Sequence, residues 1–300
     1  MAFDSLQEAK EPTIDDVFKP ISTLDVTEGL KSGLIGHPEV GKTGVIGTMS
    51  FLPGCEPLYV VDTEWGTRQV FNTWFPEKDI RVFEVKVLAK DPTKIDAHQT
   101  FNKIERALHL LVGETKGSIA IDSFSDIYYW MNEWVEQTAK RHKSKSSGEE
   151  FMMRTEWGKR NKRYRNMVFN LLNKPMHVIV TGQMKAVYTS GGEETKEETA
   201  AWLTRHKHWM DVLVEMQKWE RPGSVKYMST IRKCRMHRAS NYQIEDLNYV
   251  KLLHHMQQEF GVEVQGVNYG ELKEINKEII DRFKMKPNAI KKAFGDLSKK

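Results

Sequence analysis

The sequence predicts an α/β protein in which a mostly parallel, twisted sheet is flanked by helices and carries an antiparallel hairpin at its edge. Three observations predict this class. Short apolar runs alternate with amphipathic stretches from residue 32 to residue 183, a phosphate-binding sequence follows the first run, and two β-like runs flank the turn ERPGS. Such alternation is typical of βαβ units, whose parallel strands are buried on both faces.

Each expected element follows from its own local pattern. Strands are short apolar runs, and helices repeat apolar residues at steps of three and four and end at glycine or proline. The expected strands are SGLIG, LYVV, SIAID and HVIVTG. The expected helices cover residues 41–52, 101–111, 127–135, 155–173 and 272–283. Polar sequence predicts loops over 140–150 and 188–199, and the hairpin covers 211–233.

Composition and organisation indicate one large domain with two appendages. Of the 300 residues, 39% are hydrophobic and 29% are charged, which is typical of globular proteins. No apolar run reaches the roughly 18 residues of a membrane span. The residues MAFDSLQEAKEP have neither the basic start nor the apolar stretch of a signal peptide, and the sequence has no CxxC pair, so we expect a cytoplasmic protein without a membrane partner. The expected units are an N-terminal arm (1–31), a core (32–260) and a C-terminal helical extension (261–300).

The sequence GHPEVGKT, residues 36–43, matches G-x-x-x-x-G-K-[ST] in full between a predicted strand and a predicted helix. The backbone N–H groups of such a loop hold phosphate oxygens. Lys42 is expected to reach the β- and γ-phosphates and Thr43 to ligate Mg²⁺, so the motif predicts ATP and Mg²⁺ as cofactors. A chance glycine-lysine turn is the alternative. The expected nucleotide contacts are Gly36, His37, Pro38, Glu39, Val40, Gly41, Lys42, Thr43 and Gly44.

Carboxylates that follow apolar strands are the next candidates. Asp122 ends SIAID, at the edge where parallel sheets bind ligands, and is expected to join Thr43 at the metal; a helix cap is the alternative. Glu64 follows LYVVD and is expected to polarise the attacking water as general base. An ion pair with Arg68 is its alternative role. Asp62 is expected to hold the strand end or the water shell of the metal.

The chain resembles the RecA superfamily over about residues 34–235. The resemblance rests on four motifs in a fixed order: the phosphate loop, VVDTE-x-G-T-R, IAIDS and VIVTGQ. The motif DTE-x-G-T-R is most similar to the corresponding motif of RadA-like and phage Sak-type single-strand annealing ATPases, and KaiC-like and DnaB-like ATPases are more distant. The resemblance implies a RecA-like fold and P-loop ATPase activity, with Glu64 as the catalytic glutamate. It also implies that Gln183 senses the γ-phosphate; a strand-end amide that caps backbone groups is the alternative.

The same resemblance assigns a role to the sequence RKCRM. Lys233 and Arg235 match the K-x-R pair that hexameric and KaiC-like relatives insert into the nucleotide site of a neighbouring subunit, and Lys185 is a lesser candidate. Cations supplied in trans would stabilise charge on the transferring phosphoryl group. Hydrolysis would then depend on a homo-oligomeric ring or filament. Two solvated cations at a strand end are the alternative.

A basic stretch between residues 140 and 165 is the candidate nucleic-acid surface. Ten basic residues stand there against three acidic ones, together with Phe151, Trp157 and Tyr164. Cations and aromatic rings suit single-stranded DNA; a solvated face with Trp157 and Tyr164 in the core is the alternative. The segment 188–199, where relatives hold a second DNA-binding loop, has four glutamates and one lysine and departs from that pattern. The expected contacts are Lys143, Lys145, Lys159, Arg160, Lys162 and Arg163.

Two functional hypotheses follow. The first is an ATP-dependent, DNA-binding RecA-like protein that acts in recombination or single-strand annealing. The second is a KaiC-like ATP-driven switch, or another phage nucleotide-binding ATPase, without DNA binding. A small-molecule kinase is less favoured because no lid-like arginine cluster follows the core. A fold that only binds nucleotide is disfavoured by the coexistence of Lys42, Thr43, Glu64 and Asp122.

Overall fold

The computed structural model describes residues 29–111, 114, 116–143, 150–188, 194–202, 206–221, 224–236, 241–264, 266–285 and 289. Nearly all of the expected N-terminal arm therefore lies outside the described residues. Among the described helices, none combines the length and the apolar character that a bilayer crossing needs.

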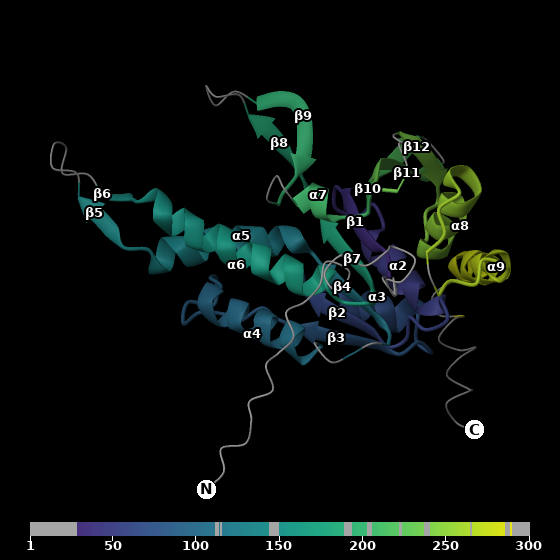
Figure 1. Cartoon of the computed structure of the whole chain (residues 1–300), viewed down its shortest axis with the longest axis horizontal. Helices are drawn as coiled ribbons and strands as arrows, with labels where there is room; N and C mark the ends of the chain where they lie inside the picture. Colours follow the sequence, from purple (N-terminus) through teal and green to yellow (C-terminus); the bar gives the residue numbers. More distant parts are fainter. Residues whose placement is uncertain are drawn as a thin grey trace, which may run out of the picture.

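The central sheet has eight strands in the order β12-β11-β10-β1-β7-β4-β2-β3 (Figure 1). The six strands from β10 to β3 are parallel, while β11 and β12 are antiparallel and form the edge. This arrangement confirms the predicted fold class, including the hairpin. The strands are β1 (Lys31–Gly36), β2 (Leu58–Asp62), β3 (Ile80–Glu84), β4 (Ser118–Asp122), β7 (His177–Gly182), β10 (Val212–Arg221), β11 (Ser224–Cys234) and β12 (Tyr242–Glu245).

Helices cover both faces of the sheet, and Figure 1 shows α4, α5 and α6 together on one side and α8 and α9 on the other. Neighbouring strand residues therefore enter different cores: Val60 packs on the face of α8 and α9, and Val61 packs on the face of α4 to α6. Burial on both faces explains the unbroken apolar runs of the sequence. The helices are α2 (Lys42–Gly47), the 3₁₀ turn η2 (Thr48–Phe51), α3 (Thr67–Trp74), α4 (Ala97–Leu110), α5 (Phe124–Thr138), α6 (Arg154–Leu172), α7 (His206–Trp209), α8 (Tyr249–Phe260) and α9 (Leu272–Lys284).

Two small antiparallel ribbons stand outside the central sheet. One pairs β5 (Arg141–Lys143) with β6 (Glu150–Met152) at the outer end of α5 and α6, and the other pairs β8 (Met184–Tyr188) with β9 (Glu194–Ala200) (Figure 1). The expectation of plain loops over 140–150 and 188–199 is therefore wrong at these strands. All three residues of β5 are exposed, and residues 184–187 of β8 are only partly buried, so neither strand has the fully buried apolar run that marks a strand of the central sheet.

Several elements have no counterpart among the expected ones. The strand β3 lies at the sheet edge, where none of its residues is fully buried, and α3 buries only Thr67 and Phe71. In contrast, the C-terminal helix is confirmed, and its Leu272 and Ile279 join the same core as α8. Tyr164 is also in the core, because only 1% of its surface is exposed. Its ring therefore does not reach a nucleic-acid surface.

Candidate active site

The phosphate-loop sequence lies between β1 and α2, as predicted. Gly36 ends β1 so close to β10 that an added Cβ would stand 2.4 Å from the Met216 carbonyl oxygen. Gly41 precedes α2 with a φ of 91°, a backbone conformation that glycine adopts at little cost. The amides of this loop and the first turn of α2 offer N–H groups to an anion.

Lys42 lies beneath the loop and is almost fully buried. Its Nζ donates hydrogen bonds to the carbonyl oxygens of Gly36 at 2.9 Å and His37 at 2.7 Å. Burial lowers the pKa of Lys42, and the carboxylates of Asp122 and Glu64 act in the opposite direction. A bound triphosphate would offer its negatively charged oxygens to the Lys42 ammonium, which here binds the carbonyl oxygens of the loop.

Asp122 ends β4 and contacts the phosphate-loop helix directly. Its Oδ2 accepts a hydrogen bond from Thr43 Oγ1 at 2.6 Å, and its Oδ1 accepts one from Thr181 Oγ1 at 2.5 Å. Burial raises the pKa of Asp122 to about 6, while the bonds from Thr181 and Thr43 work against that rise. Both oxygens are thus engaged by side chains of α2 and β7, and the residue at the N-cap of α5 is Ser123.

Thr43 and Asp122 fit a magnesium ion. Mg²⁺ is commonly held by one or two protein oxygens together with substrate phosphates and water, rather than by a full protein cage. The described part of the chain contains no group of three or more His, Cys, Asp or Glu residues placed to hold a metal. The hydroxyl and the carboxylate also lie beside the phosphate loop, where the phosphates would complete the coordination.

Glu64 projects from the turn after β2. The buried Asp62 builds this turn, because its Oδ1 accepts from the backbone N–H groups of Glu64 at 2.9 Å and Trp65 at 3.1 Å. Asp62 therefore holds the strand end, which is one of its two expected roles. Arg68 pairs with Glu84 at 3.4 Å, and among the described residues no ion pair joins Arg68 to Glu64, which was the alternative role of Glu64.

Gln183 meets Glu64 across the strand ends. Its Nε2 donates to Glu64 Oε1 at 3.0 Å, and its backbone N–H donates to Ser125 Oγ at 2.8 Å. Its side chain is thus bonded to the candidate base rather than to backbone groups. Lys42, Thr43, Glu64, Asp122 and Gln183 all line one cleft of about 530 Å³.

Further hydrogen bonds join the strand ends beneath the cleft, and sequence reasoning missed them. The hydroxyl of Thr63 donates to Asp126 at 2.8 Å and accepts from the Ser123 backbone N–H at 2.6 Å. Burial raises the pKa of Asp126 in this position. Thr181 and Ser125 also belong to this group of supporting residues. The only signal in the sequence is that each hydroxyl lies at or just beyond the end of an apolar strand.

Lys233 and Arg235 do not line the cleft of their own chain. Lys233 Nζ donates to the carbonyl oxygens of Lys207, His208 and Met210 at 2.9, 3.1 and 2.6 Å. Arg235 donates to the His208 carbonyl at 2.8 Å and pairs with Asp211 at 3.1 Å. Both cations therefore bind the end of α7, and their action on a neighbouring subunit stays a prediction.

The residues expected to contact nucleic acid fall into different environments. Lys143 and Lys162 are exposed, Lys159 pairs with Glu156 at 2.7 Å, and Lys145 lies outside the described residues. Arg163 pairs with Glu105 at 2.7 Å, and only 16% of its side chain is exposed, so it joins α6 to α4.

Arg160 belongs to a separate cationic cleft. Its guanidinium donates to Asn132 Oδ1 at 2.5 Å and lies over the rings of Tyr128 and Trp157. With Lys185 from β8 and Lys207 from α7 it lines a polar cleft of about 280 Å³. Sequence reasoning did not connect Lys207 with this surface, because its charge stands outside the basic stretch.

Comparisons with known proteins identify the domain. The sequence profile of a family described as "AAA domain" matches residues 28–241. No curated protein matches the chain. The solved structures similar to it include the RadB recombinase, at 15% identity and a TM-score of 0.41, covering 72% of this chain and 86% of the other. Another is a KaiC-like protein from the hyperthermophilic archaeon Pyrococcus horikoshii OT3, at 16% identity and a TM-score of 0.41, covering 73% and 85%.

Proposed function

The chain belongs to the AAA-domain family, and on that premise we propose that it binds ATP with Mg²⁺ and hydrolyses the γ-phosphate. We further propose that it acts on single-stranded DNA in recombination or strand annealing, as a RecA-like homo-oligomer in a ring or filament. The observation that carries the first proposal is the cleft that Lys42, Thr43, Glu64, Asp122 and Gln183 share.

In the proposed reaction, water attacks the γ-phosphorus, the bond to the β–γ bridging oxygen breaks, and ADP and phosphate leave. Glu64 accepts the proton of the attacking water. Gln183 holds the Glu64 carboxylate by the 3.0 Å hydrogen bond. Lys42 offsets the charge of the phosphate oxygens. Magnesium, held by Thr43 and Asp122, would neutralise phosphate charge when bound.

Steady-state ATPase assays on the wild type and on Glu64→Gln test this reaction. We expect the variant to bind ATP like the wild type and to turn over at least about 100-fold more slowly, because a positioned base contributes roughly 10²–10⁴ to the rate. Glu136→Gln is the matched control, since Glu136 is exposed on α5 and outside the cleft. Undiminished hydrolysis by Glu64→Gln would overturn the assignment of the base.

The proposal of DNA binding is supported by the three cations of one cleft. Arg160, Lys185 and Lys207 line this cationic cleft with Tyr128. Lys162 lies outside the cleft and adds an exposed cation on α6, the helix that carries Arg160. Phosphates of a single strand would bind the cations, and a base would stack on an aromatic ring. Gln183 directly precedes β8, the strand that carries Lys185, so residues next to each other in the chain would connect the nucleotide and DNA sites.

Replacing Lys162, Lys185 and Lys207 together by glutamine tests the DNA site. We expect weaker binding of single-stranded DNA, a salt dependence reduced by about 2 in log–log slope, and loss of DNA-stimulated ATPase activity. Three exposed lysines elsewhere, Lys90, Lys116 and Lys277, provide a control with the same charge change. Equal DNA binding by the two triple variants would contradict the assigned surface.

A mixing experiment tests whether Lys233 and Arg235 act in trans. Glu64→Gln lacks the base and Arg235→Ala lacks the cation, so each is expected to be nearly inactive alone. In a mixed oligomer an intact Glu64 and an intact Arg235 can meet at one interface, and activity should return on mixing. Failure to complement, with oligomers of the mixed composition present, would overturn the trans role.

One observation favours the alternative of an ATP-driven switch without DNA. Glu198 on β9 contacts His37 of the phosphate loop, with Nε2 and Oε2 3.0 Å apart. Through this contact, nucleotide bound at the phosphate loop would directly change the position of the acidic ribbon of β8 and β9. If the wild type hydrolyses ATP yet fails to bind single-stranded DNA at low salt, the switch is the better function.

A further inference from the structure

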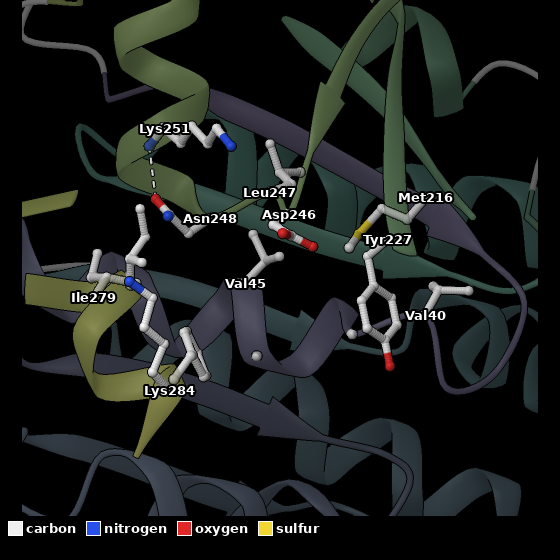
Figure 2. Close-up of a pocket in the computed structure, with 14 residues that line it drawn as sticks. Val40, Val45, Met216, Tyr227, Asp246, Leu247, Asn248, Lys251, Ile279 and Lys284 are labelled. Atoms are coloured by element: carbon white, nitrogen blue, oxygen red, sulfur yellow. Dashed lines mark hydrogen bonds between the residues drawn. The ribbon is translucent and has the colours of Figure 1, made fainter. Parts of the chain in front are cut away.

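Two surfaces beside the nucleotide cleft have not yet been given a role. Figure 2 shows one of them, an apolar pocket of about 480 Å³ that Val45, Asp246 and Ile279 help to line. This pocket shares Gly41 and Gly44 with the nucleotide cleft, so it is a continuation of the site already described. The other surface consists of exposed aromatic rings that follow the carboxyl ends of β4 and β2, and no role in the nucleotide site accounts for it.

The most exposed of these rings belongs to Trp65, the residue after the candidate base Glu64. Its surface is 52% exposed. Trp65 has a φ of 65°, a left-handed conformation that is rare for a bulky side chain and persists only where the surrounding structure enforces it. The backbone N–H of Trp65 donates to the buried Asp62 at 3.1 Å, which fixes the turn. An exposed ring that is held at the cost of backbone strain indicates a binding role rather than a packing role.

Trp65 belongs to a group of aromatic rings and cations. The Nζ of Lys86 lies 4.7 Å from the centre of the Trp65 ring. Tyr129 on α5 is 42% exposed, and the centre of its ring is 5.9 Å from that of Tyr128. Tyr128 lines the cationic cleft, where the Nζ of Lys185 lies 5.1 Å from the centre of its ring. These five residues are called the aromatic band below.

The strand order places the aromatic band along one edge of the sheet. The strands β7, β4, β2 and β3 are adjacent and parallel, so their carboxyl ends lie at the same edge. The segments that follow these four ends carry, in the same order, Lys185, Tyr128 with Tyr129, Trp65 and Lys86. Because neighbouring strands are about 4.8 Å apart, the four ends span about 14 Å. The band is therefore an extended surface that begins at the cationic cleft and reaches the turn of Glu64.

Asp126 is an acidic group within this surface. Its carboxylate accepts a hydrogen bond from Thr63 at 2.8 Å, and its charge acts on both Lys86 and Tyr129. Lys86 and Tyr129 therefore lie close to the same carboxylate. Because Asp126 is bonded to Thr63 and faces Lys86, its charge is partly offset. The cations Lys86 and Lys185 at the two ends of the band remain as sites for phosphate groups.

We propose that the aromatic band stacks the unpaired bases of single-stranded DNA, which rests on the DNA binding proposed above. A flat exposed ring beside a cation suits a nucleotide, because the base stacks on the ring and the phosphate binds the cation. Bases in a duplex are already paired and stacked, so the band favours a single strand. A second copy of this chain fits the band less well, because lysine is depleted at protein interfaces.

Stacking on Trp65 would also act on the candidate base. The backbone N–H groups of Glu64 and Trp65 both donate to Asp62 Oδ1, so a single carboxylate oxygen holds the base and the ring in the same turn. A DNA base that shifts the ring would therefore shift Glu64 relative to the phosphate loop. The band thus gives single-stranded DNA a direct influence on the rate of ATP hydrolysis.

Equilibrium titration with two labelled strands tests the band: an oligodeoxythymidylate and an abasic strand of the same length and charge. The wild type should bind the thymidylate at least about tenfold more tightly, since each stacked base contributes roughly 5- to 150-fold. Trp65→Ala should reduce this ratio at least about fivefold and leave the affinity for the abasic strand within about twofold, because the phosphate contacts remain. Trp65→Phe keeps a ring and should retain most of the preference.

Two further variants complete the test. Trp219→Ala is the matched control, because Trp219 is 43% exposed on the hairpin of β10 and β11, and it should bind both strands like the wild type. Tyr129→Ala removes the second exposed ring and should lower the ratio at least about twofold. This variant replaces Trp65→Ala if the latter does not fold. Relative to its own basal rate, Trp65→Ala should show no more ATPase stimulation by the thymidylate than by the abasic strand.

The outcomes separate the band from the proposed function. A wild type that binds neither strand would overturn DNA binding itself, whereas equal binding of both strands would overturn stacking alone. An unchanged ratio in Trp65→Ala would overturn the role of Trp65. If that variant also sediments as a smaller oligomer, its ring belongs to an interface between copies instead. Full stimulation of Trp65→Ala by the thymidylate would overturn the influence on Glu64.

Discussion

The strand ends around the phosphate loop and the outer surface of α6 differ in how their charged groups are held. At the strand ends, Asp62 and Asp122 are buried, and residues far apart in sequence share hydrogen bonds. On α6, Lys162 is exposed, whereas Arg163 one residue later is mostly covered. A fixed network suits chemistry that requires exact placement of groups, whereas exposed cations suit a flexible, charged polymer.

Lys42→Met gives the largest expected effect, because it removes the buried cation of the network while keeping the length of the side chain. ATP affinity should fall by about 100-fold or more, since a charge-assisted contact to phosphate is lost in a partly desolvated site. Calorimetry with ATP and Mg²⁺ measures this. Lys94→Met, on the exposed surface, is the control, and equal affinities in the two variants would show that the loop is not the phosphate site.

A buried histidine supports the outer region and predicts acid sensitivity. His206 contacts Tyr164 of α6 at 2.5 Å and stacks on Trp202, and burial lowers the pKa of His206 to about 3. In the unfolded chain His206 is protonated below about pH 6.5, whereas in the folded chain it stays neutral until the pH is far lower. The contribution of neutral His206 to the free energy of unfolding is therefore fully present above about pH 6.5 and is lost as the pH falls below that value.

Between pH 7 and pH 4.5 this effect amounts to about 2–3 kcal/mol. His206→Gln should be less stable than the wild type at pH 7 because the stacked ring is lost, and its stability should fall less on acidification. Urea unfolding at both pH values measures the difference. Parallel loss of stability in the two proteins would contradict the neutral, buried state of His206.

Arg163 and Lys162 provide a direct test of the contrast between paired and exposed cations. Arg163→Ala should lower the free energy of unfolding by about 1–2 kcal/mol, through the lost pair with Glu105 and the lost contacts with Phe101 and Trp134. Lys162→Ala should change it by less than about 0.5 kcal/mol and should weaken DNA binding more. Denaturant unfolding measures the stability of both variants, and DNA titration measures their affinity for single-stranded DNA. A larger loss of stability in Lys162→Ala, or a larger loss of DNA affinity in Arg163→Ala, would contradict the distinction between paired and exposed cations.

Glu198→Gln gives the smallest expected effect on stability. The His37–Glu198 pair is exposed, with 56% and 45% of the side chains accessible, so its loss should cost less than about 0.5 kcal/mol. Thermal unfolding measures that cost. A larger loss would show that the ribbon of β8 and β9 is fixed to the phosphate loop more firmly than an exposed pair allows.

The same contrast explains what the sequence could predict. The phosphate loop is a local pattern, and Glu64 and Asp122 each follow an apolar strand, so the sequence itself predicts these residues, whereas Gln183 is predicted only through the resemblance to the RecA superfamily. Thr181 and Thr63 act through partners about 60 residues away, and nothing in their neighbours indicates the contact. The edge strand β3 and the polar ribbons bury no continuous apolar face, which removes the periodicity that prediction needs.

The distribution of charged residues in the sequence predicts where positive charge is concentrated, but it does not predict which cations form ion pairs. The basic stretch contains Arg163, whose partner Glu105 is 58 residues away, and Lys162, which stays exposed. The pocket of Asp246 and α9 was also missed, because it forms only when the C-terminal segment packs beside the phosphate loop.

A crystal structure of Glu64→Gln with ATP and Mg²⁺ tests the central claim most directly. We expect the triphosphate on the loop beside Lys42, the ion at Thr43 and Asp122, residue 64 and Gln183 facing the γ-phosphate, and the base beside Val45 and Ile279. A triphosphate bound elsewhere, or residue 64 turned away from the γ-phosphate, would contradict the account.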